Sequence, residues 1–165
     1  MDTIMQINVQ RISVTSRKTF ADVVAALERQ LGRPDMSKFF SDIATSGSEA
    51  ELERIINTAV GPLDLMEFAR FDQGAVLQRT LGEDAPQVMR FLVGNPLVMR
   101  EMVKVLPDAG SYAPVTILID ERADGVHLSY DRIASFLASY GNAEALKVAK
   151  TLDGKIEALL ETAAN

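Results

Sequence analysis

The fold is decided by residues 90–132, RFLVGNPLVMREMVKVLPDAGSYAPVTILIDERADGVHLSYDR. Two turn signals divide this stretch into short apolar runs. Asp124-Gly125 is typical of a tight hairpin, because Gly tolerates the positive φ that such a turn requires, so the flanking residues 115–119 and 126–130 are predicted to be paired strands. Asn95-Pro96 predicts a helix start, because Asn caps the first turn and Pro lacks the amide hydrogen that would otherwise have no partner.

Alternating apolar and polar residues predict further strands on both sides of this stretch. The alternation extends over residues 4–15, 63–71 and 88–93. Asp72-Gln73-Gly74 is interpreted as a turn, with a returning strand over residues 75–79 that completes a second hairpin.

Apolar residues spaced by three and four predict helices. One follows Thr19 and ends at Gly32, and a second follows Ser48, which forms a capping box with Glu51. A long helix follows Asn142 to the C-terminus, and Gly154 inside it predicts close packing, since Gly costs about 1 kcal/mol relative to Ala in a helix. Residues 35–47 contain enough apolar side chains to pack, as either a short helix or an ordered loop.

Together these elements predict an α+β fold in a single domain, residues 1–165. We expect an antiparallel sheet of about five to six strands with a long C-terminal helix packed across it, plus one or two helices inserted in the N-terminal half. A chain of 165 residues, 47% of them hydrophobic, is long enough to bury one sizeable core.

Composition excludes several classes of function. The chain has no cysteine and a single histidine, so thiolate nucleophiles, thiolate metal sites and multi-histidine metal sites are excluded within one chain. We expect no metal and no cofactor. A formal net charge of −6 disfavours both nucleic acid and anionic membranes as partners. No apolar run reaches the length of a membrane span and no secretory signal is visible, so a cytoplasmic location is the default expectation.

Three titratable residues are the candidates for catalysis. Asp72 lies near Glu67 in sequence and would act as a general base if it were buried beside another carboxylate, although Asp at a turn more often serves local hydrogen bonds. His127 is the only side chain that titrates near neutrality without perturbation, and on a strand of alternating polarity it is most simply a residue of the sheet surface. Nucleophile-elbow and glycine-rich phosphate motifs are absent from the sequence.

Four further residues are candidates for ligand binding. Tyr112 and Tyr130 each anchor either a ligand or the edge of a core through the hydroxyl group. Asn95 serves either a ligand or the helix cap, and Pro96 after it favours the cap. Gln73 lies in the predicted turn. Met residues around the central strands either line an adaptable pocket or fill the core.

The chain resembles the domain-of-unknown-function family 302. The resemblance rests on a set of motifs that occur in order and end with the last helix: Phe71-Asp72-Gln73-Gly74, Gly94-Asn95-Pro96, Tyr112-Ala113-Pro114, Leu128-Ser129-Tyr130-Asp131 and residues 148–155. It covers residues 60–163 best, with residues 33–60 as a helical insertion. It implies a fold similar to the TATA-binding-protein class and a homodimer. Relatives often have His where this chain has Gln73, so a site that needed that histidine would be lost here.

The resemblance implies no activity, and likeness to a DNA-binding fold transfers no function. Our leading hypothesis is therefore a soluble homodimeric binding or assembly module for a small apolar or amphipathic ligand. The alternative hypothesis is a hydrolase-like enzyme that uses Asp72, Glu67 and His127, which requires these three side chains to converge in one concavity.

Overall fold

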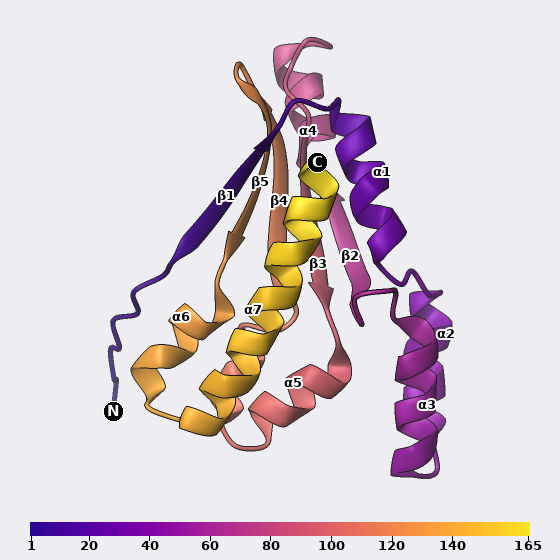
Figure 1. Cartoon of the computed structure of the whole chain (residues 1–165), viewed down its shortest axis with the longest axis vertical. Coiled ribbons are helices and arrows are strands. Elements are labelled where there is room, and N and C mark those ends of the chain that lie inside the picture. Colours follow the sequence, from indigo (N-terminus) through magenta and orange to yellow (C-terminus); the bar gives the residue numbers. More distant parts are fainter.

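A computed structural model describes all 165 residues and shows an α+β protein with one antiparallel sheet (Figure 1). The sheet has five strands in the order β1-β5-β4-β3-β2, which confirms the predicted class. The strands are β1 Arg11–Ser16, β2 Met66–Asp72, β3 Val88–Gly94, β4 Val115–Arg122 and β5 Gly125–Asp131. The α-helices are α1 Phe20–Gln30, α2 Met36–Thr45, α3 Glu49–Ala59, α4 Gln73–Leu81, α5 Pro96–Val103, α6 Ile133–Leu137 and α7 Ala143–Ala164, with short 3-10 helices η1 Pro107–Ser111 and η2 Ala138–Tyr140.

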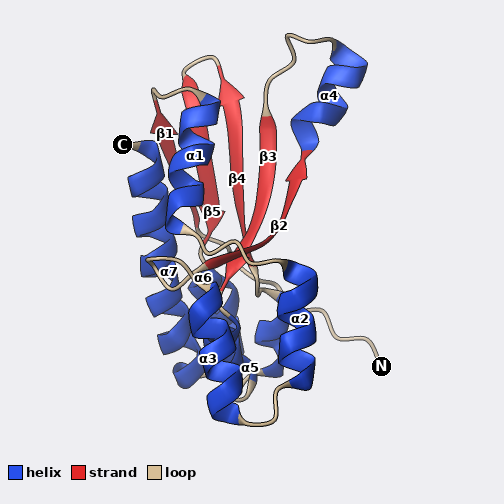
Figure 2. Cartoon of the chain, turned by 90° about the vertical axis from the view of Figure 1, so that its right-hand side faces the viewer, coloured by secondary structure: helices blue, strands red, loops and turns tan.

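Helices α1 and α7 pack side by side against one face of the sheet (Figures 1 and 2). The strands turn alternate apolar side chains to them, and Ile117, Ile119 and Leu128 of this face have no exposed surface. Fully burying such a side chain contributes about 1.5–3 kcal/mol, so this layer holds the main core. The predicted packing of the long C-terminal helix across the sheet is confirmed.

The turn signal at Gly125 and the cap signals at Asn95 and Asn142 form the predicted structures. Gly125 has φ of +139° and pairs with Arg122 across a two-residue turn, which makes β4 and β5 a tight hairpin. The Asn95 Oδ1 atom accepts a hydrogen bond from the Leu97 amide at 2.8 Å, and this bond caps the start of α5. Asn142 Oδ1 accepts one from the Ala145 amide at 2.9 Å and begins α7.

The boundaries of two predicted strands and the existence of a third were wrong. Strand β2 begins at Met66 rather than at residue 63. Strand β1 begins at Arg11 rather than at residue 4, because its neighbour β5 ends at Asp131 and the preceding residues have no strand to pair with. Residues 75–79 belong to α4 rather than to a returning strand. Asp72 accepts a hydrogen bond from the Ala75 amide at 2.9 Å and so caps a helix where a turn was predicted. Residues 35–47, predicted as helix or loop, contain α2.

Helices α2 and α3 form a pair below the sheet that is joined to it at two glycines (Figure 1). The amides of Gly32 and Gly61 both donate to the Leu65 carbonyl, at 2.9 and 2.8 Å. A Cβ atom on Gly32 would lie 1.8 Å from the Ala59 carbonyl oxygen, so only glycine allows this close crossing of the backbone. The crossing places the α2–α3 pair beside the start of β2.

No helix lies along the middle of the opposite face of the sheet (Figure 2). The side chains that alternate onto this face include Leu92, Leu118 and His127, together with the exposed Phe71. We call it the uncovered face. None of the seven α-helices combines the length and apolar content needed to cross a lipid bilayer.

Candidate functional site

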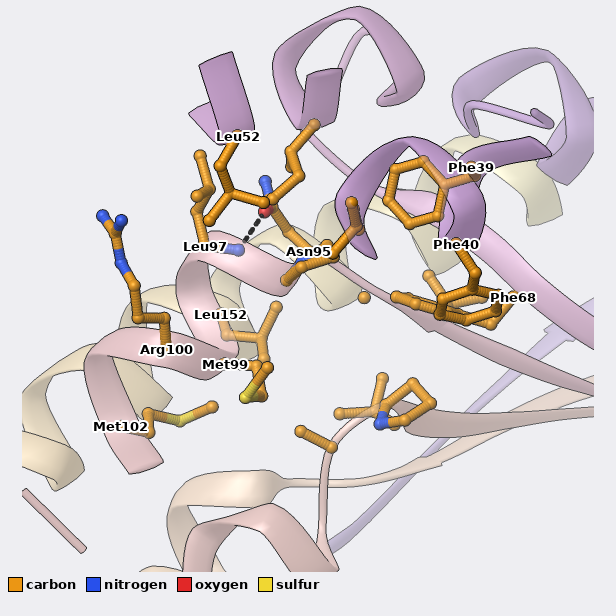
Figure 3. Close-up of a pocket in the computed structure, with 18 residues that line it drawn as sticks. Phe39, Phe40, Leu52, Phe68, Asn95, Leu97, Met99, Arg100, Met102 and Leu152 are labelled. Atoms are coloured by element: carbon orange, nitrogen blue, oxygen red, sulfur yellow. Dashed lines mark hydrogen bonds between the residues drawn. The ribbon is translucent and has the colours of Figure 1, made fainter. Parts of the chain in front are cut away.

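The feature with the clearest character of a binding site is an apolar pocket of about 390 Å³, which is smaller than several polar surface hollows but is lined almost wholly by apolar residues. It lies where the α2–α3 pair, α5 and the ends of the central strands meet, and Leu152 of α7 closes one side (Figure 3). Small-molecule sites in proteins occupy about 300–1,000 Å³ and are lined mainly by apolar side chains, so the pocket falls within the usual range. We refer to it as the apolar pocket.

Three local features of the sequence build its walls. Asp35 caps α2 by accepting from the Lys38 amide at 2.8 Å, and α2 then turns Phe39 and Phe40 toward the strands. Ser48 caps α3 in the same way, accepting from the Glu51 amide at 3.1 Å. Most of the wall residues come from α2 and α3 (Phe39, Phe40, Ile43, Leu52, Ile56), from the strands and the segment before β4 (Phe68, Val93, Ala113, Pro114, Val115) and from α5 and α7 (Leu97, Met99, Met102, Leu152).

Among the large apolar side chains that line the pocket, Phe40 and Met99 are the exposed ones, and we call the part of the pocket that they line its mouth. The exposed fraction of Phe40 is 55% and that of Met99 is 36%, whereas Phe39, Ile56 and Met102 in the interior are buried. Large apolar side chains at the mouth of an apolar hollow are a common mark of a ligand or partner site. The chain therefore leaves apolar surface accessible at this place.

Only two of the 18 lining residues, Asn95 and Arg100, carry a polar side chain. Asn95 is fully engaged, because its Oδ1 atom caps α5 and its Nδ2 atom donates to the Asp64 carbonyl at 2.9 Å. The Arg100 guanidinium points away from the apolar interior and binds carboxylates at the rim (Figure 3). The interior thus offers apolar contact and no unpaired polar group to a ligand.

The three catalytic candidates lie apart. Asp72 and Glu67 are at opposite ends of β2, about 17 Å apart at the usual rise of a strand. His127 is on β5, three strand spacings from β2, or about 14 Å. The structure therefore does not bring Asp72, Glu67 and His127 into one concavity.

Each catalytic candidate has a local partner instead. Glu67 is nearly buried and binds Arg70 through two hydrogen bonds of 2.5 and 2.7 Å. Asp72 caps α4. His127 lies on the uncovered face, where its Nε2 atom is 2.8 Å from Asp124 Oδ1, and this contact holds the pKa of Asp124 below its usual value. The hairpin turn shields the imidazole, whose exposed fraction is 11%.

Of the four ligand-binding candidates, Asn95 alone lines the apolar pocket. Gln73 is the exposed first residue of α4, at the far end of β2. Tyr112 stacks on Phe136, and its hydroxyl is 2.8 Å from that of Tyr140. It also lines a separate hollow of about 210 Å³.

Tyr130 lies in the main core, where its hydroxyl donates to Asp153 at 2.6 Å. Burial first, and then the neighbouring Asp153 carboxylate, raise the pKa of Tyr130 far above its usual value. The hydroxyl therefore stays protonated and acts as a donor within the core.

Sequence reasoning did not identify the pocket residues of α2 and α3. The signal for them was weak: two adjacent phenylalanines, Phe39 and Phe40, cannot both face one core from a single helix, so one of them is left near the surface. It also missed Asp153, whose place between Ala149 and Ile156 on the apolar stripe of α7 marks it as buried. A group of three or more side chains suited to hold a metal ion is absent.

The fold and the site together define an α+β protein with one uncovered sheet face and an apolar pocket beside the sheet. The chain belongs to the family described as "Domain of unknown function DUF302", whose model matches residues 41–163. This confirms the resemblance inferred from the motifs.

A crystal structure of an uncharacterized conserved DUF302 protein from Bacillus stearothermophilus has the same fold. Its TM-score is 0.63 at 10% sequence identity, over 92% of this chain and 96% of that one. Comparison with curated proteins gives no match. These comparisons establish family and fold, and the function of the family is unknown.

Proposed function

We propose that this protein is a non-catalytic binding module that holds a small apolar or amphipathic ligand in the apolar pocket. The observation that carries the proposal is the hollow of about 390 Å³ whose interior is almost wholly apolar and whose mouth exposes Phe40 and Met99. Transfer of apolar ligand surface from water contributes about 25 cal/mol per Å², and an occupant would also cover these exposed side chains.

The scattering of the catalytic candidates favours binding over catalysis. A general base needs the reacting group within hydrogen-bond reach, and two carboxylates that share an acid–base reaction need environments that drive their pKa values apart. Here Glu67 forms an ion pair with Arg70, and Asp72 serves as a helix cap. The pocket itself contains no carboxylate, histidine or hydroxyl group that could transfer a proton.

The proposal is tested with the uncharged fluorescent probe N-phenyl-1-naphthylamine. We expect saturable binding to the full-length protein, and we expect Met99→Glu to weaken it by at least about tenfold, since a carboxylate at the mouth of an apolar pocket must lose part of its hydration. The matched control is Val76→Glu, which adds the same charge on the exposed surface of α4. Equal binding by wild type, Met99→Glu and Val76→Glu would show that the probe binds elsewhere.

The natural occupant is sought by solvent extraction of the purified protein followed by mass spectrometry. A molecule present in wild type and depleted from Met99→Glu would support the proposal. Failure of both the probe and any extracted molecule to bind would refute it.

We also infer that the protein assembles as a homodimer through the uncovered face. The half-buried Leu92 and Leu118 and the exposed Phe71 give this face apolar area that no helix of the chain covers along its middle. Leu118→Glu is expected to shift the mass measured by light scattering from dimer to monomer, while Val76→Glu leaves it unchanged. A wild-type protein that is monomeric at all concentrations would refute the inference.

A further inference from the structure

The rim of the apolar pocket carries one arginine bound to three carboxylates. Arg100 Nη1 is 3.2 Å from Glu49 Oε1, and Nη2 is 3.1 Å from Glu53 Oε1, both on α3. Its Nε atom is 3.2 Å from Glu101 Oε1 on α5. Lys104, the residue directly after α5, also binds Glu101. Each guanidinium nitrogen thus already has a carboxylate partner.

This arrangement makes the rim anionic. Two cations, Arg100 and Lys104, face three carboxylates, those of Glu49, Glu53 and Glu101, which leaves a net charge of −1. Lys104 first, and then Arg100, lower the pKa of Glu101 below its ordinary value. Lys155 and Asp64 form a pair of their own, with the Nζ and Oδ2 atoms 2.8 Å apart, and Lys38 is paired with Asp42 on α2.

A ligand with an anionic head group would meet two obstacles at this rim. It would have to displace a glutamate from Arg100, and the glutamates are tethered to the same fold, so they compete at high effective concentration. If it did not displace one, it would add a fourth negative charge beside the existing three. The net negative charge of the rim attracts a cationic head group and has little effect on an uncharged one.

Building on the proposed function, we propose that the apolar pocket selects an amphipathic molecule with an apolar chain or ring and an uncharged or cationic head group. Fatty-acid-like anions are disfavoured. The apolar part occupies the interior formed by Phe68, Leu97 and Met102, and the head group stays at the rim beside Glu49 and Glu53.

Three probes with the same decyl chain test the choice of head group: decanol, decyltrimethylammonium and decanoate. Each displaces N-phenyl-1-naphthylamine from the full-length protein below the concentration at which micelles form. At low salt we expect decyltrimethylammonium to bind about five- to tenfold more tightly than decanoate, because a net charge of −1 about 7 Å away in water attracts the one head group and repels the other. In 0.5 M NaCl this preference should shrink, because the rim is exposed and screened.

A double substitution, Glu49→Gln with Glu53→Gln, changes the rim from a net charge of −1 to +1. It should tighten decanoate binding, weaken decyltrimethylammonium binding and leave decanol unchanged. The matched control is Glu83→Gln with Asp84→Asn, which makes the same change in total charge in the exposed segment between α4 and β3. That control should keep the wild-type preference.

The outcomes separate this inference from the proposed function. If decanoate binds as tightly as decyltrimethylammonium or more tightly, the pocket still binds ligands but the choice of head group is refuted. The choice of head group is also refuted if both double variants shift the preference equally, because the preference then depends on the total charge of the protein and not on the rim. If decanol and the fluorescent probe also fail to bind, the proposed function fails and this inference fails with it.

Discussion

Asp153 is a carboxylate of α7 that lies inside the main core, with an exposed fraction of 5%. It accepts three hydrogen bonds, from the Tyr130 hydroxyl at 2.6 Å and from the amides of Ile133 and Ala134 at 2.8 and 3.2 Å. The two amides are at the start of α6, which has no capping side chain of its own. A side chain of the last helix therefore caps another helix and ties it to strand β5.

Burial raises the pKa of Asp153 above its ordinary value, more than its hydrogen bonds lower it. A folded-state pKa above the unfolded one means that the folded protein binds more protons between the two values. The free energy of unfolding therefore falls as pH rises through this range, which begins near the unfolded pKa of about 3.9. Chemical denaturation from pH 4 to 7 should show wild type losing stability relative to Asp153→Asn, which cannot titrate. A difference that is constant with pH would contradict this.

The pKa of Tyr112 should depend on its hydrogen bond with Tyr140. The hydrogen bond between the two hydroxyls, with a smaller effect of burial, raises the pKa of Tyr112 to about 12. Tyr140→Phe removes the bond, so the pKa of Tyr112 should fall toward the ordinary value of about 10. Alkaline titration of phenolate absorbance measures this shift. Tyr130→Phe is the control, because Tyr130 is bound to Asp153 elsewhere in the core, and an unchanged curve for Tyr140→Phe would be the contrary result.

At the scale of elements, Gly154 shows that a glycine inside a helix does not by itself indicate close packing. Its position inside α7 predicted a close contact, but that prediction was wrong: a Cβ atom there would meet nothing within 4 Å. Gly154→Ala should therefore raise the free energy of unfolding by about 1 kcal/mol, because Ala is the better helix former.

The matched control is Gly125→Ala in the β4–β5 hairpin. There φ is +139° and a Cβ atom would lie 2.5 Å from the Ser16 carbonyl oxygen. We expect a loss of about 1–3 kcal/mol, since a non-glycine residue is strained in this conformation. Thermal and chemical denaturation of both variants measure the two effects, and destabilisation by Gly154→Ala would show an unrecognised role for that glycine.

Elements with strong local signals could be predicted from the sequence. The hairpin at Gly125, the helix start at Asn95 and the helix start at Asn142 each depend on residues within a few positions of one another. The region after Asp72 could not be predicted in this way, because an Asp that caps a helix and an Asp that begins a turn make similar local hydrogen bonds. The start of β1 depends on where β5 ends, which is information from residues more than a hundred positions away.

At the scale of the whole molecule, the pocket depends on contacts between elements that are distant in the chain. Phe40 of α2 and Met99 of α5 lie at the same mouth although 59 positions separate them. Periodicity identifies the apolar side of each helix, but it does not say which helices meet or whether their side chains fill the space between them. The pocket was therefore expected only in general terms, from the apolar and Met-rich composition around the central strands.

The α2–α3 pair has its own small apolar cluster, formed by Phe39, Ile56 and Met66, apart from the main core of the sheet. A unit held by a small cluster, a glycine crossing and exposed ion pairs should open at a lower free energy than the central strands. Amide hydrogen exchange should thus be faster in α2 and α3 than in β4. Bound N-phenyl-1-naphthylamine, which bridges α2, α3 and α5 in the pocket, should slow exchange in these helices and leave α4 unchanged. Exchange in α2 as slow as in β4 without the probe would show that the pair is not a separate unit, and uniform slowing that includes α4 would show that the probe does not act through the pocket.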